Sequence, residues 1–372
     1  MLTDDGVRIE AAYEPLAAGA ADRADRGAVD TADRARGGDP ARGGDPARGG
    51  GLARGGGLAM GGLMADSLGT DSLRTDSQVA DSQVADSQVA GGPVMGPAIV
   101  VAHGFTGALE RPALRRAAAV LGRHAAVVTF SFRGHGRSGG RSTVGDREVL
   151  DLAAAVRWAR RLGHRRVATV GFSMGGSVVL RHAALYGAGA DRGAGPGSGP
   201  GAGPGAGPGS VAESGPGSGA APEPGAGPGA LEAKGGAGAR EAAHADAVVA
   251  VSAPARWYYR GTAPMRRVHW AITRPAGRLV SRYGLRTRID SRGWDPEPLS
   301  PVAAAPLIAP TPLLIVHGDR DPYFPLDHPR ALAEAADPSS TELWIEPGFG
   351  HAENAADAAL LDRIAAWATA RL

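Results

Sequence analysis

The chain has 372 residues and a net charge of only +2, from 40 Lys and Arg against 38 Asp and Glu, and it contains no cysteine. This charge balance does not favour a nucleic-acid partner, and the lack of cysteine excludes disulfides, thiolate catalysis and metal sites built on cysteine. No run reaches the ~18 apolar residues of a membrane span. The opening residues, MLTDDGVRIE, lack the basic and apolar regions of a secretory signal, so we expect a cytoplasmic protein.

Two low-complexity segments interrupt the chain, at residues 17–93 and 187–238. The first contains tandem repeats of GGDPAR and DSQVA, and the second consists mainly of Gly, Pro and Ala. Such short repeats cannot form the units of a solenoid, and neither segment has aromatic residues with which to build a core. We predict that both are disordered inserts. The remainder, on the order of 240 residues, suits one α/β domain within the range 1–372.

Outside the inserts, strand patterns alternate with helix patterns. Apolar runs predict strands at 6–15, 98–104, 125–132, 165–171, 245–253, 312–318 and 341–347. Apolar residues spaced by three and four predict helices at 110–124, 146–163, 173–187, 331–336 and 355–372. The first strand follows the turn pair Asp5-Gly6, which suits an antiparallel hairpin. This alternation predicts the α/β class, with a mostly parallel, doubly wound sheet and helices on both faces.

The stretch GFSMG at residues 171–175 matches the pattern G-x-S-x-G where a predicted strand meets a predicted helix. In that context the turn presents its serine in a strained conformation, and the flanking glycines let strand and helix approach closely. Ser173 is therefore the candidate nucleophile. The alternative, a structural serine in a tight turn, is less consistent with the strand-to-helix position.

A serine nucleophile needs a general base, and the base needs a group that orients it. Asp321 follows the sixth predicted strand in the run HGDRDP, and His351 follows the seventh in the run GFGH. Open α/β sheets gather their sites at the carboxyl ends of their strands, so both side chains are expected beside Ser173. Asp319 competes with Asp321 for the role of the acid.

These motifs resemble those of the serine hydrolases of the α/β-hydrolase fold, in the branch of esterases, lysophospholipases and serine aminopeptidases. Besides GFSMG, the chain contains HGFTG at 103–107, FRGHGRS at 132–138, HGDRD at 317–321 and GFGH at 348–351. The resemblance covers the chain apart from the two inserts. It implies the α/β-hydrolase fold, a variable cap over the site, and activity without a metal or cofactor.

The resemblance also implies residue roles. Asp321 rather than Asp319 is expected to orient His351, which acts as the general base. His103 and His135 are expected in turns that shape the fold.

Two backbone N–H groups are expected to form an oxyanion hole. Met174 would donate from the start of the helix after the nucleophile, and Phe105 from the loop after the strand at 98–104. With Ser173, these groups predict hydrolysis of a small-molecule carboxylic ester or thioester through an acyl-enzyme. The alternatives are a peptidase or amidase of the aminopeptidase-like branch, and a non-catalytic binding protein. Substrate identity and oligomeric state stay open.

Residues 255–308 break the alternation and are the expected helical cap. An apolar wall could come from Trp257, Tyr258, Tyr259, Met265 and Trp270. The arginines of this region are Arg256, Arg260, Arg266, Arg267, Arg274 and Arg278. They are either ordinary helix surface or a means of recognising a carboxylate or phosphate on the substrate. Both inserts are expected to leave the sheet at the edge opposite Ser173.

Overall fold

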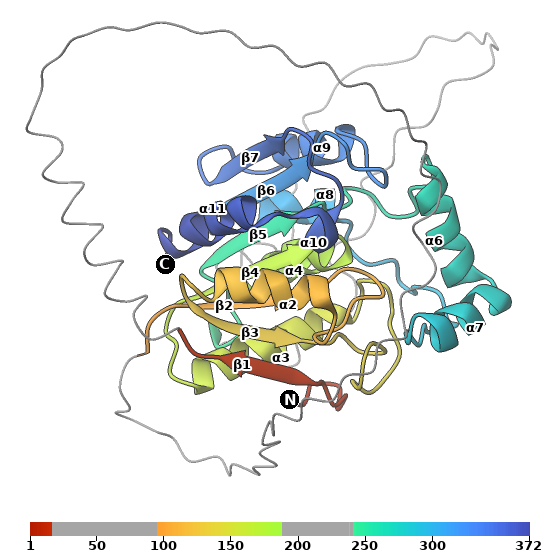
Figure 1. Cartoon of the computed structure of the whole chain (residues 1–372), viewed down its shortest axis with the longest axis horizontal. Coiled ribbons are helices and arrows are strands. Elements are labelled where there is room, and N and C mark those ends of the chain that lie inside the picture. Colours follow the sequence, from red (N-terminus) through yellow and green to blue (C-terminus); the bar gives the residue numbers. More distant parts are fainter. Residues whose placement is uncertain (17–94, 188–237, 239–240) are drawn as a thin grey trace, which may run out of the picture. The chain divides into compact units, whose positions relative to one another are not determined.

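The computed structural model describes residues 1–16, 95–187, 238 and 241–372, and this part is built around a seven-stranded sheet (Figure 1). The strands are β1 (Ala11–Glu14), β2 (Ala98–Ala102), β3 (Ala126–Phe130), β4 (Val167–Phe172), β5 (Ala247–Val251), β6 (Leu313–Gly318) and β7 (Thr341–Glu346). Their order is β1-β3-β2-β4-β5-β6-β7, with β1 antiparallel to β3 and the other pairs parallel. The predicted sheet is confirmed. The predicted inserts lie outside the described residues, apart from Gly187 and Gly238.

Helices cover both faces of the sheet (Figure 1). One face carries α2 (Pro112–Leu121), α10 (Ala352–Ala355) and α11 (Ala358–Thr369). The other carries α3 (Glu148–Arg161), α4 (Met174–Tyr186), α8 (Pro301–Ala304), the 3-10 helix η3 (Ala305–Leu307) and α9 (Asp327–Ala335). The doubly wound arrangement predicted from the alternation is therefore confirmed.

The central strands are mostly apolar because each has a helix layer on both sides. In β2, Ile99 and Val101 pack in the cluster that contains α2 and α11, whereas Val100 packs in the cluster that contains α3 and α4. Every residue of β2 is buried. A continuous apolar run is the sequence pattern that such a two-sided environment requires.

The elements at the two ends of the chain differ from their predicted extent, and α9 begins four residues before the helix predicted at 331–336. The first strand is limited to β1, because residues 3–7 form a turn in which Gly6 has a φ of 79° and the N–H of Thr3 donates to the Val7 carbonyl. The last predicted helix, 355–372, is shortened to α11, and α10 precedes it and overlaps it only at Ala355. The Asp357 side chain accepts the N–H of Leu360 at 2.8 Å, so it caps α11 and sets a new helix start.

The residues that flank the undescribed segments lie at the edge of the sheet opposite the carboxyl ends of its parallel strands. In the antiparallel β1, Glu14 pairs with Val127, near the start of β3. Ala98 opens β2 at the same edge, since it pairs with Ala126 and Val167. Helix α4 begins directly after β4 and packs against it, so its last turn returns to this edge.

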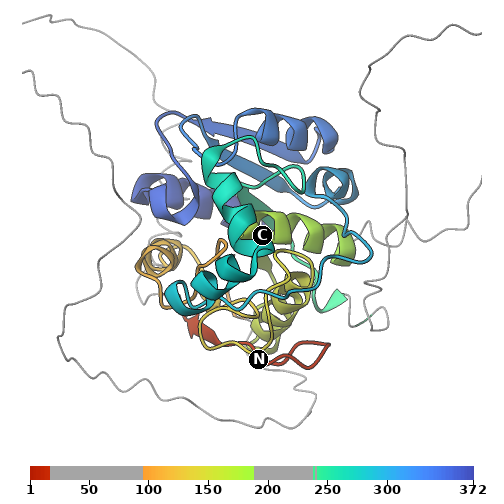
Figure 2. The ribbon, with the colours of Figure 1, turned by 90° about the vertical axis from the view of Figure 1, so that its right-hand side faces the viewer.

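Residues 255–308 divide into two parts. Helices α6 (Ala263–Thr273) and α7 (Pro275–Gly284) contact each other where they meet at Arg274, and they lie in front of the sheet in the view of Figure 2. Residues 301–308 instead pack against α4, with Ala304, Ala305 and Ile308 buried in the core. The pair of α6 and α7, with the arginines that flank it at 260 and 286, is called the cap hairpin below.

Candidate active site

Ser173 forms the sharp turn between β4 and α4. Its φ of 52° and ψ of −113° lie in a region that residues with a side chain rarely adopt. The turn is possible because two glycines permit close backbone contacts. A Cβ on Gly171 would overlap the carbonyl oxygen of Gly175, and a Cβ on Gly175 would overlap the carbonyl oxygen of Ala102. Close backbone contacts therefore explain why both flanking positions of GFSMG are glycine. The sharp turn places Ser173 just beyond the end of β4.

The structure brings Ser173, His351 and Asp321 together from three different strand ends. His351 Nε2 lies 2.9 Å from Ser173 Oγ, and His351 Nδ1 lies 2.7 Å from Asp321 Oδ2. The side chain of Asp321 is fully buried, whereas that of His351 is 14% exposed. A hydrogen-bonded chain thus runs from a buried carboxylate through an imidazole to a hydroxyl.

The surroundings of Asp321 keep it ionised. Burial raises its pKa, but the hydrogen bond to His351, the nearby His351 charge and the backbone N–H of Tyr323 bring the pKa below its ordinary value. The N–H groups of Tyr323 and Phe324 donate to Oδ1 at 2.8 and 3.1 Å. An ionised Asp321 favours the proton on Nδ1 of His351, which leaves Nε2 free to accept the proton of Ser173.

Asp319 lies elsewhere. Its side chain accepts the N–H of Gly348 at 2.6 Å and is exposed, so it supports the turn that precedes His351. Asp321, the carboxylate that the resemblance favoured over Asp319, is the one that contacts the imidazole.

Phe105 and Met174 carry the two backbone N–H groups predicted to bind an oxyanion. Within the described residues, no acceptor is paired with either N–H group. Met174 is the first residue of α4, where backbone N–H groups lack helical partners and the helix dipole favours negative charge. Phe105 follows Gly104, where an added Cβ would stand 3.3 Å from Ser173 Cβ, so the two segments lie close together. Both groups are available to a negatively charged oxygen near Ser173.

Two buried histidines hold the loop that carries Phe105. The N–H of Phe132 donates to His103 Nε2 at 3.0 Å, so His103 Nδ1 carries the proton and donates to the Gly104 carbonyl at 2.7 Å. His135 Nε2 accepts the N–H of Thr106 at 3.3 Å. Burial lowers the pKa of His103 to about 3, so this histidine stays neutral and serves the shape of the loop.

Glu353 is a buried carboxyl group at the site that the sequence reasoning missed. Its Oε1 accepts the N–H of Gly104 at 3.1 Å, and the residue is only 6% exposed. A Cβ on Gly104 would stand 3.3 Å from both carboxyl oxygens and 3.3 Å from Ser173 Cβ, so Glu353 lies beside the nucleophile. Burial raises the pKa of Glu353, although the N–H of Gly104 and the charge of His351 oppose this. Nothing in the local pattern HAEN indicated this contact.

Ser252, at the end of β5, is a second contact that the pattern did not indicate. Its Oγ accepts the N–H of Ala352 at 3.1 Å, in the residue directly after His351. Ala352 has a φ of 54°, a conformation that needs support from its surroundings. Ser252 therefore helps to hold the backbone that presents the imidazole.

The cap hairpin begins next to the imidazole. The ring of Tyr323 stacks on that of His351 with centroids 4.3 Å apart, and the hydroxyl of Thr262, which caps α6, donates to the Tyr323 carbonyl at 2.9 Å. Burial and the Asp321 charge raise the pKa of Tyr323, while Arg267 on α6 opposes them. After α7, Thr287 and Ile289 form bridges with His135 and Ser142, in the loop that follows β3. The segment thus spans the edge of the sheet at which Ser173 lies.

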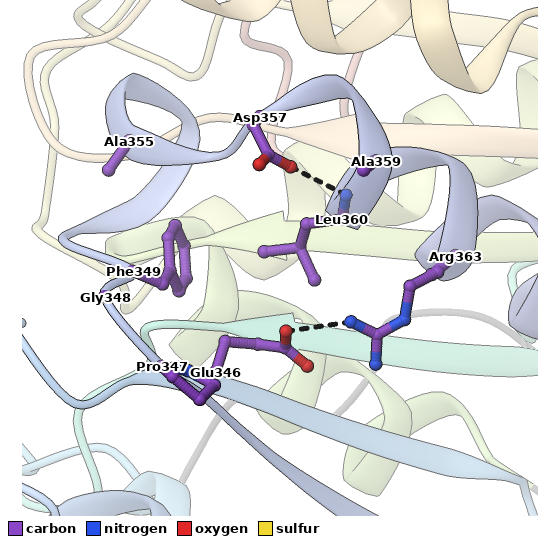
Figure 3. A pocket seen from close by; sticks show the side chains of 9 residues that line it. All are labelled: Glu346, Pro347, Gly348, Phe349, Ala355, Asp357, Ala359, Leu360 and Arg363. Carbon is purple, nitrogen blue, oxygen red and sulfur yellow. Dashed lines mark hydrogen bonds and ion pairs between the residues drawn. The ribbon is translucent and has the colours of Figure 1, made fainter. Parts of the chain in front are cut away.

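A separate cavity of about 240 Å³ lies beside the turn before His351 (Figure 3). It is lined by Glu346, Pro347, Gly348, Phe349, Ala355, Asp357, Ala359, Leu360 and Arg363. Its charged groups are already partnered, because Arg363 pairs with Glu346 at 2.8 Å and Asp357 caps α11. None of Ser173, His351 and Asp321 lines it, and it offers no free group for chemistry.

The residues that the structure describes contain no cluster of acidic residues and histidines able to hold a metal ion. No helix among them has the length and apolar character to cross a membrane.

The sequence profile of the α/β hydrolase fold family matches residues 97–192, which include β2, β3, β4 and the turn at Ser173. With the observed sheet, this identifies the chain as a protein of the α/β-hydrolase fold.

Among solved structures, the chain is similar to the esterase Pf2001 of Pyrococcus furiosus, with 19% identity, a TM-score of 0.45, and 74% of this chain and 82% of that chain covered. Est1E of Butyrivibrio proteoclasticus with bound ferulic acid gives 18% identity, a TM-score of 0.39 and coverages of 75% and 88%. The esterase domain of a Rhodothermus marinus protein gives 18% identity and a TM-score of 0.41, with 77% of this chain and 90% of that chain covered. Similarities this distant say nothing about substrate. A search of the curated proteins found no match.

Proposed function

We propose that the protein is a serine hydrolase that cleaves a carboxylic ester or thioester of a small molecule through an acyl-enzyme on Ser173. The observation that carries the proposal is the hydrogen-bonded chain from Asp321 through His351 to Ser173. The free N–H groups of Phe105 and Met174 beside it support the same chemistry.

The reaction follows from this arrangement. Ser173 Oγ attacks the carbonyl carbon of the substrate while His351 Nε2 takes the hydroxyl proton, and the buried Asp321 carboxylate stabilises the resulting imidazolium. The N–H groups of Phe105 and Met174 donate to the oxyanion of the tetrahedral intermediate; one such donor is typically worth about 3 kcal/mol of transition-state stabilisation. As the intermediate collapses, His351 returns the proton to the leaving alcohol or thiol. Water then attacks the acyl-enzyme by the same steps and releases the acid.

Labelling with a fluorophosphonate probe tests the nucleophile directly. The wild type should become labelled and Ser173→Ala should not. Ser177→Ala is the matched control, because Ser177 lies one turn further along α4 and donates to the Met174 carbonyl, and this variant should be labelled like the wild type. Equal labelling of wild type and Ser173→Ala, or no labelling of either, would reject the proposal.

The two alternatives are measured alongside. Matched ester and amide substrates with the same acyl group distinguish an esterase from a peptidase or amidase, and we expect faster ester cleavage. A protein that binds ligands without catalysis would hydrolyse neither substrate and would resist the probe.

A further inference from the structure

The cap hairpin carries an unusual surface. From residue 260 to residue 286 the chain has seven arginines and no Asp or Glu. Within the described residues, none of these arginines forms an ion pair with a carboxylate. Some donate to backbone carbonyls, as Arg278 does to Ile272 and Thr273 at the end of α6. The side chains at 266, 267, 274, 282 and 286 are exposed. The positive charge of the hairpin is therefore uncompensated within the described structure.

Helix α7 also exposes an apolar stripe. Ala276, Leu279, Val280 and Tyr283 follow the spacing of one helical face. Leu279, Val280 and Tyr283 are 59%, 50% and 71% exposed. In an amphipathic helix of a globular protein such a stripe faces the core, but here it faces outward.

The opposite face of α7 is the one that packs inside the molecule. Gly277 and Ser281 are buried, and a Cβ on Gly277 would overlap the backbone of α6 at Trp270 and Ala271. The orientation of α7 is thus determined by its contact with α6. Because this contact fixes α7, the apolar stripe faces outward. Trp270 on α6 is 47% exposed and adds an aromatic ring to the same hairpin.

We propose that the cap hairpin docks on an anionic lipid surface, with the stripe of Leu279, Val280 and Tyr283 in the interfacial region and the arginines on the lipid phosphates. A short helix with an apolar face and flanking arginines is the pattern of helices that lie in the plane of a membrane interface. Near such a surface each arginine adds about fivefold in affinity through its attraction to anionic headgroups. Arg282, which lies 5.5 Å from the Tyr283 ring, joins the two parts of this surface.

Other occupants fit less well. A two-fold dimer through this face would place one arginine-rich surface against another, which costs repulsion. A nucleic acid would satisfy the arginines, but it has no use for aliphatic side chains such as Leu279 and Val280. Of these three occupants, only a lipid surface satisfies both the charge and the apolar stripe.

The docking would bring the candidate site to the lipid. The hairpin starts at Thr262, whose hydroxyl contacts the backbone of Tyr323, and the Tyr323 ring lies on His351. On the proposed hydrolase function, the favoured substrates are therefore esters that partition into, or are carried by, an anionic lipid surface.

Vesicle sedimentation with the full chain tests the docking without any activity assay. Binding to equimolar phosphatidylcholine and phosphatidylserine should exceed binding to phosphatidylcholine alone by about tenfold or more, and should fall as salt shortens the Debye length. Leu279→Ser with Val280→Ser should reduce binding about tenfold. Arg282→Gln with Arg286→Gln should reduce it by about tenfold or more. The matched control is Arg165→Gln with Arg166→Gln, which precede β4 at the opposite edge of the sheet and should bind like the wild type.

All four substituted hairpin residues are exposed, so circular dichroism should show unchanged folding. Equal binding to neutral and anionic vesicles would overturn the proposal. The proposal would also be overturned if the protein did not bind vesicles but bound a DNA duplex in a salt-dependent way. It would be overturned as well if the protein did not bind vesicles but formed a dimer that Leu279→Ser abolished. Because this experiment measures binding, its result on docking remains valid even if Ser173→Ala leaves hydrolysis unchanged and the proposed hydrolase mechanism fails.

Discussion

The imidazole of His351 contacts the carboxylate of Asp321 at 2.7 Å through Nδ1, the nitrogen that does not face Ser173. If this contact orients the base, Asp321→Asn should lower kcat by about 10⁴, the size of effect found when the acid of a serine-protease triad is replaced. Asp319→Asn is the matched control, because the Asp319 side chain accepts the Gly348 N–H rather than contacting the imidazole, and its loss should cost far less. Steady-state kinetics on an activated ester gives both values, and the reverse ranking would assign the acid to position 319.

Gly175→Ala should destabilise the fold. The added Cβ would meet the carbonyl oxygens of Ala102 and His103, which are backbone atoms that cannot rotate away. We expect a loss of about 3 kcal/mol in the free energy of unfolding, measured by urea denaturation. Gly96→Ala provides the comparison, since its added Cβ would meet nothing within 4 Å. Similar unfolding midpoints for the two variants would contradict the steric account of the turn.

Glu353→Gln should change how stability depends on pH. Burial raises the pKa of Glu353 in the folded chain above its ordinary value of 4.5, so the folded state holds this proton more tightly than the unfolded state. The contribution to stability is complete below the unfolded-state pKa and is lost as pH rises through the folded-state pKa. Gln does not titrate but can still accept the N–H of Gly104.

The melting temperature of the wild type should therefore fall relative to that of Glu353→Gln as the pH rises from about 4 to 8. Thermal melts of both proteins across this range make the comparison. Glu110→Gln serves as the control, because Glu110 is only partly buried and lies in a different loop. Parallel melting curves for the wild type and Glu353→Gln would show that the carboxyl does not titrate differently on folding.

Replacing residues 17–93, or residues 188–237, with short Gly/Ser linkers should leave ester turnover within about twofold and stability within about 1 kcal/mol. The described residues on either side of both segments lie at the edge of the sheet opposite Ser173. Loop closure costs only about 0.6 kcal/mol for each doubling of length, so shortening changes stability little. A large loss of kcat in a variant that still melts cooperatively would show that the removed segment acts at the site.

The local requirements of the turn at Ser173 could be predicted from the sequence. A buried strand, two glycines and a helix start are all determined by neighbours within a few residues, and the pattern GFSMG contains them. The strands could be predicted for the same reason, since a short apolar run between two helices is typical of a buried parallel strand.

The environment of the imidazole could not be predicted in this way. Glu353 contacts Gly104 across 249 positions of the chain, and Ser252 contacts Ala352 across 100. Neither residue belongs to a pattern, because each matters only through a backbone group brought close by the packing of other elements. The Pro-broken pattern of residues 255–308 predicted helices. It did not predict that the apolar face of α7 would face outward.

The order of side chains along the chain thus determined the class of fold, the succession of strands and the choice of Ser173 as the candidate nucleophile. These follow from periodicity and short-range sterics, which act within one element and its neighbours. Only the tertiary structure shows that Asp321 contacts His351 while Asp319 supports the preceding turn, that Glu353 is buried beside Ser173, and that the arginines of the hairpin form no ion pair with a carboxylate among the described residues. Those outcomes depend on how segments remote in sequence pack against one another. The free energy of that packing is distributed over many contacts, and no short sequence pattern contains them.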